Sequence, residues 1–325
     1  MKKNKPIVIV AGEPNSVFLE IFFKTYKKIS FKKPILLVVS KKLLLSQMKS
    51  LKYRLSFNFL EKKNMNLENL SNKKINVINI DYNFKKPFDK ISYKSKKYIN
   101  DCFNIGLNII KKNNLKFLVN GPISKSHFLE KEYQGITEYL ADKTNKSGDE
   151  TMLIFNKELS VCPITTHDAL RTIFKKITKE KIIRKVLTIN KFYKNFLKVK
   201  PCFAVTGINP HCETKDKINE EKNIIVPAIK FLKKRKVIVD GPFPSDTIFL
   251  KQNLKKYNVI IGMYHDQVLS PIKAIYGFDA INITLGLPFI RISPDHGPNE
   301  NMIGKNLSDP LSLIRTINFI NKFEN

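Results

Sequence analysis

The sequence predicts an α/β fold built on mostly parallel strands. Short runs of β-branched and other apolar residues recur along the 325-residue chain. Most of these runs are followed by a stretch with apolar residues at helical spacing, and this alternation is typical of parallel sheets. With 42% apolar residues, the chain is long enough for one large or two medium domains with a sizeable core.

Strands and helices are expected in a regular order along the chain. Strands are predicted at residues 6–11, 35–39, 75–80, 117–119, 152–155, 159–165, 203–206 and 237–239. Helices are predicted from residue 16 and at 41–51, 92–112, 137–142, 170–198, 218–236, 245–254 and 310–323. The fifth and sixth strands could form a hairpin through residues 156–157.

The formal net charge of +30 invites a nucleic-acid interpretation, which the composition argues against. Only six of the 58 basic residues are Arg, and the excess is Lys spread through every segment. Modules that stack bases combine aromatic residues with Arg, and no such pattern is visible. We expect no nucleic-acid partner, although the surface should attract small anions.

The sequence predicts a cytoplasmic protein. It contains no run of eighteen apolar residues, so no membrane span is expected. The apolar run at residues 7–11 is too short for a signal peptide and ends in Gly12-Glu13-Pro14. The four cysteines lie far apart without a C-x-x-C pair, and free thiols are expected.

The stretch 259–298 carries the densest set of chemically useful side chains. A β-branched run ends in Gly262 and is followed by His265 and Asp266. Lys273, Asn282 and Arg291 come next, separated by apolar residues. An imidazole, a carboxylate, an amide and two cations in one segment suit a small anionic substrate held beside a metal ion.

Three of the five histidines end strand-like runs in the same way. The runs VCPITTH, FAVTGINPH and VIIGMYH end at His167, His211 and His265. Carboxyl ends of parallel strands gather at one edge of a sheet, so these imidazoles can converge on a divalent ion with positions left for substrate. Three carboxylates could orient an imidazole or bind a substrate amine: Asp168, Asp246 and Asp266.

Phosphate is the anion that best fits the remaining polar set. Lys273 supplies a point charge, Arg291 a planar fork, and Thr137 and Asn282 neutral hydrogen bonds. The first strand is followed by GEPNSVFLE and not by G-x-G-x-x-G, which disfavours a Rossmann dinucleotide site. The turn-rich segment 296–310 could instead wrap an adenosine.

Seven blocks form a recognisable pattern: NGPISK (120–125), G-x-TEYLA (135–141), TTHDALR (165–171), TGINPH (206–211), GPFPSDT (241–247), YHDQVLSPIK (264–273) and FDAINITLGLPFIRISPDHG (278–297). These blocks resemble the 4-hydroxythreonine-4-phosphate dehydrogenase family of pyridoxal phosphate biosynthesis. The blocks keep their order across the chain, and several are long and unusual. The family is similar in fold to isocitrate and isopropylmalate dehydrogenases.

The resemblance implies two α/β domains around a cleft. Residues 1–125 with 290–325 would form the cofactor-side domain, and 126–289 would carry the metal, the substrate and the dimer contact. It also implies a homodimer whose sites are shared across subunits, each with one divalent ion (zinc, magnesium, cobalt or manganese) bound by His167, His211 and His265.

The remaining roles implied by the resemblance concern substrate and cofactor. Substrate contacts are Thr137, Lys273, Asn282 and Arg291; catalytic residues are Asp246, Asp266 and Lys273; contacts to NAD or NADP are His296, Gly297, Asn301 and Gly304. The family oxidises C3 of 4-phosphooxy-L-threonine, and the resulting β-keto acid loses CO2 to give 3-amino-2-oxopropyl phosphate.

The sequence departs from the family pattern in three places. Ile136 stands where the family usually has His, GEPNSVFLE lacks the inner glycines of the N-terminal loop, and residues 298–300 are atypical of the adenosine loop. Alternatives are a dehydrogenase of threonate or erythronate 4-phosphate, an inactive paralogue, or a nucleic-acid-binding paralogue.

Overall fold

The computed structural model describes residues 5–61, 67–130, 132–215 and 218–323, which divide into two compact units. The N-terminal unit comprises the described residues up to Tyr139 together with those from Pro288 onward. The C-terminal unit is Leu140–Leu287. The boundaries predicted from the sequence lie at 125/126 and 289/290.

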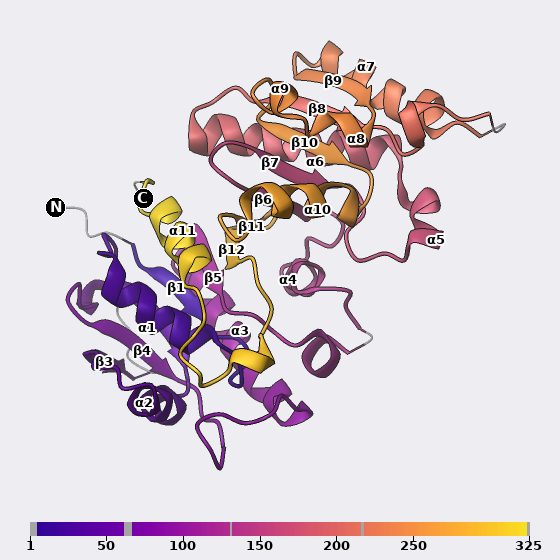
Figure 1. The fold of residues 1–325 in the computed structure, drawn as a ribbon. Coiled ribbons are helices and arrows are strands. Elements are labelled where there is room, and N and C mark those ends of the chain that lie inside the picture. Colours follow the sequence, from indigo (N-terminus) through magenta and orange to yellow (C-terminus); the bar gives the residue numbers. More distant parts are fainter. Residues whose placement is uncertain (1–4, 62–66, 131, 216–217, 324–325) are drawn as a thin grey trace. The chain divides into compact units, whose positions relative to one another are not determined.

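The N-terminal unit is built on a parallel sheet with the strand order β3-β4-β2-β1-β5-β12 (Figure 1). The strands are β1 (Ile7–Val10), β2 (Ile35–Val39), β3 (Phe57–Leu60), β4 (Ile75–Asn79), β5 (Phe117–Asn120) and β12 (Ile290–Pro294). The central strands β1, β2 and β5 are buried along their whole length, as expected for parallel strands covered on both faces.

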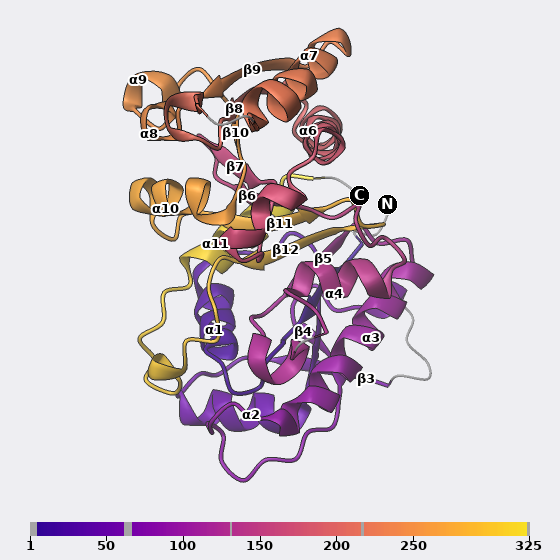
Figure 2. The ribbon, with the colours of Figure 1, turned by 90° about the vertical axis from the view of Figure 1, so that its right-hand side faces the viewer.

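Helices cover both faces of this sheet. Those assigned wholly to the unit are α1 (Phe18–Lys28), α2 (Lys41–Ser50), α3 (Lys96–Lys112) and α11 (Leu311–Ile320). Helices α1, α2 and α11 lie on one face and α3 on the other (Figure 2). Right-handed crossovers between parallel strands produce this division. Helix α1 connects β1 to β2 on one side of it, and α3 connects β4 back to β5 on the other side of β1, so the two helices lie on opposite faces.

The loops after β1 and β5 approach each other closely where the strand order reverses. Gly121 N donates to Val10 O at 2.8 Å, and Glu13 N donates to Pro122 O at 2.9 Å. A Cβ on Gly121 would lie 2.2 Å from Ala11 O. Only glycine fits this approach, which occurs at the position where ligands bind in open α/β sheets.

The carboxyl group of Glu13 is buried at this reversal point. It accepts hydrogen bonds from Asn15 N at 3.1 Å and Ser95 Oγ at 2.9 Å. Burial raises the pKa of Glu13 to about 7; these hydrogen bonds oppose the rise and the charge of Glu300 adds to it.

The C-terminal unit has a mixed sheet with the strand order β11-β6-β7-β10-β8-β9. The strands are β6 (Thr151–Phe155), β7 (Ser160–Pro163), β8 (Cys202–Thr206), β9 (Ile238–Phe243), β10 (Val259–Gly262) and β11 (Ile281–Leu285). Strand β6 is antiparallel to β7 and β11, whereas β7, β10, β8 and β9 pair in parallel. The carboxyl ends of β7, β10, β8 and β9 therefore lie at the same edge of the sheet.

Two helical layers enclose this second sheet. Its helices are α5 (Leu170–Ile173), α6 (Lys179–Phe192), α7 (Val226–Lys234), α8 (Ser245–Ile248), α9 (Lys251–Leu254) and α10 (His265–Tyr276); α4 (Ile136–Lys143) spans the boundary between the units. Helices α8, α9 and α10 lie on one face, and α6 and α7 on the other (Figure 2). The core of the first face includes Ile248, Ile260, Val268 and Ile272.

The eight predicted strands are confirmed, including the hairpin of β6 and β7. Two regions that were each predicted as one continuous helix are divided in the structure. The region 170–198 breaks at Ile177, which is extended, and Thr178 then caps α6 by accepting from Lys181 N. The region 245–254 breaks at Leu250, which is also extended, between α8 and α9.

Strands β3, β11 and β12 and helix α10 were not predicted. The four cysteines are free thiols, as expected. Within the described ranges, none of the helices is long and apolar enough to cross a membrane.

The raised pKa of Glu13 makes stability depend on pH in a defined direction. The folded carboxyl binds its proton up to about pH 7, while an unfolded Glu releases it near pH 4.3. The stabilisation is thus fully present below pH 4 and is lost as pH rises towards 7. Because Gln resembles the protonated carboxyl, Glu13→Gln should remove this loss.

We expect the Glu13→Gln variant to be more stable than wild type at pH 8, by about 2–4 kcal/mol, and nearly equal to it at pH 4. Thermal unfolding midpoints of both proteins at the two pH values measure this. Equal pH dependence in the two proteins would contradict the assignment.

Candidate functional site

Four adjacent parallel strands of the C-terminal unit each deliver a polar side chain just beyond their carboxyl ends. His167 follows β7, His265 follows β10, His211 follows β8, and Asp246 follows β9 in the first turn of α8. The predicted gathering of strand ends at one edge is thereby confirmed for these strands. This edge is the candidate site.

The structure brings two of the imidazoles close together. The ring centroids of His167 and His265 lie 6.1 Å apart. With metal–nitrogen bonds of 2.0–2.1 Å, two imidazoles on one ion have centroids within about 6.5 Å of each other. His265 Nδ1 lies 2.7 Å from Asp266 Oδ1, so Nε2 is the atom that can bind an ion. Asp266 thus orients His265, as the sequence suggested.

His211 lies on the loop that follows β8, in an unusual backbone conformation. His211 and Cys212 have φ of 56° and 62°, in the left-handed region that non-glycine residues rarely adopt. Each such residue costs of order 1–3 kcal/mol, and strain of this kind is common at functional sites. The His211 side chain is exposed.

Among the described residues of a single chain, no group of three His, Cys, Asp or Glu side chains is close enough to hold a metal ion. In the structure the rings of His167 and His265 lie close together, and His211 lies on the loop that follows the neighbouring strand β8. Asp168 makes an ion pair with Lys176. Its carboxylate therefore binds a cation of the chain itself and not a substrate amine. The three-histidine metal site stays a prediction.

The two remaining predicted residues of the C-terminal unit lie on different elements. Lys273 is exposed in the last turn of α10. Asn282 lies on β11, opposite Ile154 of β6. Its Oδ1 is buried and has no hydrogen-bond partner within the described part of the chain. An unsatisfied buried acceptor is costly, so a ligand that donates a hydrogen bond fits this position.

Thr137 and Arg291 belong to the N-terminal unit. Thr137 is buried in the first turn of α4. Arg291 on β12 is only 2% exposed, and its Nε donates to Oδ1 of Asn120 at 2.6 Å. Burial lowers the pKa of Arg291 to about 10, and the carboxylate of Glu138 opposes this shift. The guanidinium is charged at neutral pH and fixed in orientation.

The predicted adenosine loop packs against the start of α1. Val17 N donates to Pro298 O at 3.1 Å, and a Cβ on Gly304 would lie 3.0 Å from the ring of Phe88. His296 Nδ1 lies 2.9 Å from Gly297 O, and Asn301 is exposed in a short 3₁₀ turn. The four predicted cofactor contacts thus share one ordered loop.

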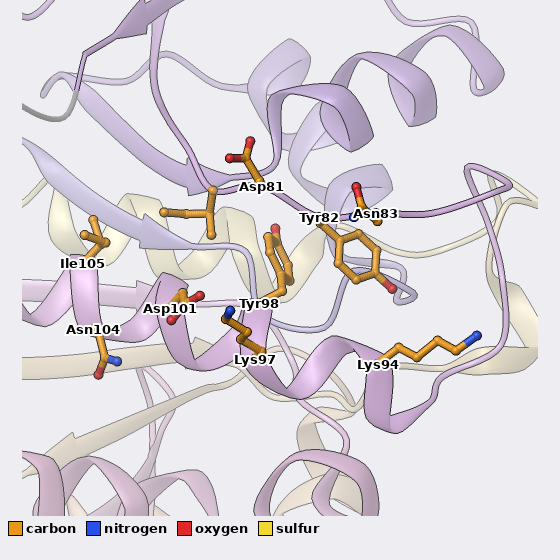
Figure 3. A pocket seen from close by; sticks show the side chains of 10 residues that line it. Asp81, Tyr82, Asn83, Lys94, Lys97, Tyr98, Asp101, Asn104 and Ile105 are labelled. Carbon is orange, nitrogen blue, oxygen red and sulfur yellow. The ribbon is translucent and has the colours of Figure 1, made fainter.

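A separate hollow of about 760 Å³ lies in the N-terminal unit, between α3 and the segment that follows β4 (Figure 3). Its polar lining includes Asp81, Lys94, Lys97 and Asp101. None of the predicted site residues is among those that line it. It is therefore distinct from the candidate site.

Comparison with known proteins places these residues in a family context. The family model "Pyridoxal phosphate biosynthetic protein PdxA" matches residues 30–320. A 4-hydroxythreonine-4-phosphate dehydrogenase of Sulfurihydrogenibium sp. is 34% identical over 316 residues, which are 96% of each chain. A D-threonate 4-phosphate dehydrogenase of Salmonella typhimurium is 34% identical over 199 residues, 60% of this chain and 61% of the relative.

Solved structures agree with this assignment. The 4-hydroxythreonine-4-phosphate dehydrogenase of Klebsiella pneumoniae superposes with a TM-score of 0.79 at 26% identity, covering 97% of this chain and 98% of that one. Isocitrate dehydrogenase from Methylococcus capsulatus shares the fold alone, with a TM-score of 0.50 at 9% identity over 97% of this chain and 84% of that one. The predicted isocitrate-dehydrogenase-like α/β fold is thereby confirmed. Since the family model spans most of the chain and a relative aligns over nearly all of it, this chain belongs to the PdxA family of 4-hydroxythreonine-4-phosphate dehydrogenases.

Proposed function

We propose that this protein oxidises C3 of 4-phosphooxy-L-threonine with NAD+ or NADP+ and decarboxylates the product to 3-amino-2-oxopropyl phosphate, a step of pyridoxal 5′-phosphate biosynthesis. In this reaction C3 loses a hydride and its hydroxyl proton, the bond from C2 to the carboxylate breaks, and C2 gains a proton. The single observation that carries the proposal is the set of histidines after adjacent parallel strands in a chain of this family.

Zinc, cobalt, manganese and magnesium are the candidate ions, and the imidazole donors at this strand edge favour the borderline zinc and cobalt over the harder manganese and magnesium. We assign His167, His211 and His265 as the ligands of the ion, supported by the 6.1 Å approach of two rings and the Asp266 contact. When bound, the ion supplies a Lewis acid for the C3 oxygen, and the dinucleotide supplies the hydride acceptor. Asp246, which follows β9, is assigned as a supporting carboxylate.

Charged and polar residues would hold the substrate. Lys273 and Arg291 match the negative charge of a phosphate, and Thr137 and Asn282 offer hydrogen bonds. The buried Oδ1 of Asn282 needs a donor, which the amine or hydroxyl of the substrate provides. Fixing the phosphate and the amine sets the direction in which C3 faces the cofactor, and this positioning accelerates the reaction.

The cofactor is assigned to the loop that follows β12. His296, Gly297, Asn301 and Gly304 lie on one ordered segment packed against α1 and Phe88. Two of the four are glycines, which allow the backbone to approach a nucleotide closely. We assign either NAD or NADP to this loop.

We further propose a homodimer with sites shared across subunits. His167 and His265 of one chain already lie close together, and a histidine from a second copy would complete the three-ligand set. The C-terminal unit also exposes large apolar side chains, including Leu170 at 62%, Phe174 at 50% and Phe278 at 57%. Contact between subunits would remove such surface from water.

A second candidate substrate is a four-carbon acid 4-phosphate without the amine. A relative named D-threonate 4-phosphate dehydrogenase favours it, and so does Ile136, which stands where the family usually has His. Ile136 begins α4 beside Thr137, so a change there alters the surroundings of a proposed substrate contact.

Parallel assays with 4-phosphooxy-L-threonine and D-threonate 4-phosphate test the proposed function. We expect kcat/KM to be about 5-fold to 150-fold higher for the amine-bearing substrate, because one unsatisfied buried contact is worth about 1–3 kcal/mol. NAD(P)H formation and CO2 release are both measured. A preference for threonate 4-phosphate would replace the proposed substrate with the alternative, and turnover of neither would refute the dehydrogenase assignment.

Replacing His211 with Ala should abolish turnover, by about 10³-fold or more if the metal supplies several kcal/mol of stabilisation. A chelator should have the same effect on wild type, reversed by adding a divalent ion. Circular dichroism checks the fold, and His127→Ala, outside the proposed set, is the matched control. Full activity of His211→Ala would remove the metal assignment.

Replacing Asn282 with Leu should separate binding from stability. The variant deletes an acceptor without a partner within the described chain, so the unfolding midpoint should stay equal or rise. The loss of a substrate hydrogen bond should lower kcat/KM by about 10–100-fold, corresponding to 1.4–2.7 kcal/mol. Unchanged kcat/KM would show that Asn282 does not contact the substrate.

A further inference from the structure

The loop that presents His211 is held by two buried side chains for which neither the sequence motifs nor the comparisons assign a role. The loop runs from Gly207 to His211, between the end of β8 and the left-handed turn. His211 itself is exposed, so packing of its own side chain does not fix its position. Whatever fixes the main chain of this loop therefore fixes the point from which the imidazole extends.

Glu221 holds the loop from one side. It is 3% exposed, and its Oε1 accepts from the main-chain N–H groups of Ile208 at 2.7 Å and Asn209 at 2.8 Å. Its Oε2 accepts from Asn209 Nδ2 at 2.9 Å. Burial raises the pKa of Glu221, but these hydrogen bonds outweigh it, and the net effect lowers the pKa. The carboxylate is therefore ionised at neutral pH.

Gln267 holds the other end of the loop and ties it to the strand that precedes His265. Its Oε1 accepts from Met263 N at 2.6 Å and from Thr206 Oγ1 at 2.9 Å. Its Nε2 donates to Gly207 O at 2.8 Å. One buried amide thus joins the ends of β8 and β10, which carry His211 and His265.

The packing around Gly207 shows how little freedom the loop has. A Cβ at this position would lie 2.6 Å from Cys212 Sγ and 3.0 Å from Glu221 Oε1. The start of the loop is therefore packed against the residue that follows His211. Glu221 and Gln267 therefore act on a segment that is closely packed at its start.

We propose that Glu221 and Gln267 are positioning residues that fix the loop carrying His211 and thereby determine metal affinity. The proposal rests on the assignment of these histidines as ligands. Groups that orient metal ligands through hydrogen bonds typically change metal affinity 10–100-fold when they are removed. Here the hydrogen bonds hold the main chain that precedes the ligand, at residues 207–209, and not the ring of the ligand.

The test measures Zn²⁺ affinity of the metal-stripped full-length protein by competition with a chromophoric chelator, without turnover. Glu221→Ala should weaken binding at least 10-fold. Glu221→Gln should weaken it less, because its amide oxygen can still accept from Ile208 N and Asn209 N.

Gln267→Glu, which keeps the two acceptor contacts and loses the donor to Gly207 O, should also weaken binding. Glu180→Ala, an exposed acid on α6, is the control and should bind as wild type does.

His211→Ala, measured in the same assay, separates the two levels of the proposal. If His211→Ala loses affinity and Glu221→Ala does not, the positioning role is wrong while the metal site stands. If His211→Ala binds as tightly as wild type, the metal site itself is wrong. Circular dichroism reports the fold; if Glu221→Ala does not fold, wild-type affinity in both Glu221→Gln and Gln267→Glu overturns the proposal.

Discussion

The site depends on one constraint: β7, β10, β8 and β9 run in parallel and therefore end at the same edge of the sheet. Residues separated by more than forty positions in sequence become neighbours for this reason alone. If one of these strands ran the other way, its terminal side chain would lie at the opposite edge, roughly 15 Å away for a strand of five residues. The pairing of the strands is thus the first determinant of the chemistry.

That constraint explains why part of the site could be predicted from the sequence. Each of His167, His211 and His265 follows an apolar run that is recognisable as a buried strand, and the parallel pairing follows from the alternation with helices. The helix that begins at His265 was missed, because its first residues are polar and Pro271 lies inside it. The prediction therefore located the imidazole but not the helical turn in which it sits.

The supporting residues were out of reach for a different physical reason. Glu221 and Gln267 look like ordinary polar residues of amphipathic helices, and nothing in their local sequence marks them as buried. Their role arises from contacts with main-chain groups 12 and 60 positions away. Such contacts depend on register between elements, which periodicity does not determine. The left-handed conformation of His211 was likewise invisible, since no glycine marks it.

Charge acts on this chain in two ways, through the surface as a whole and through single side chains. A net charge of +30 raises the concentration of small anions around the whole surface, but a field of this kind has no preferred orientation and is screened within about 8 Å at physiological salt. Orientation requires a group with fixed geometry, and the chain contains one in Arg291, whose guanidinium is buried and bonded to Asn120. Lysines on flexible stems cannot replace it, because their charge is a point without a planar fork. The basic surface can therefore speed the arrival of a phosphorylated substrate, while the proposed function assigns selection among such substrates to a few buried polar groups.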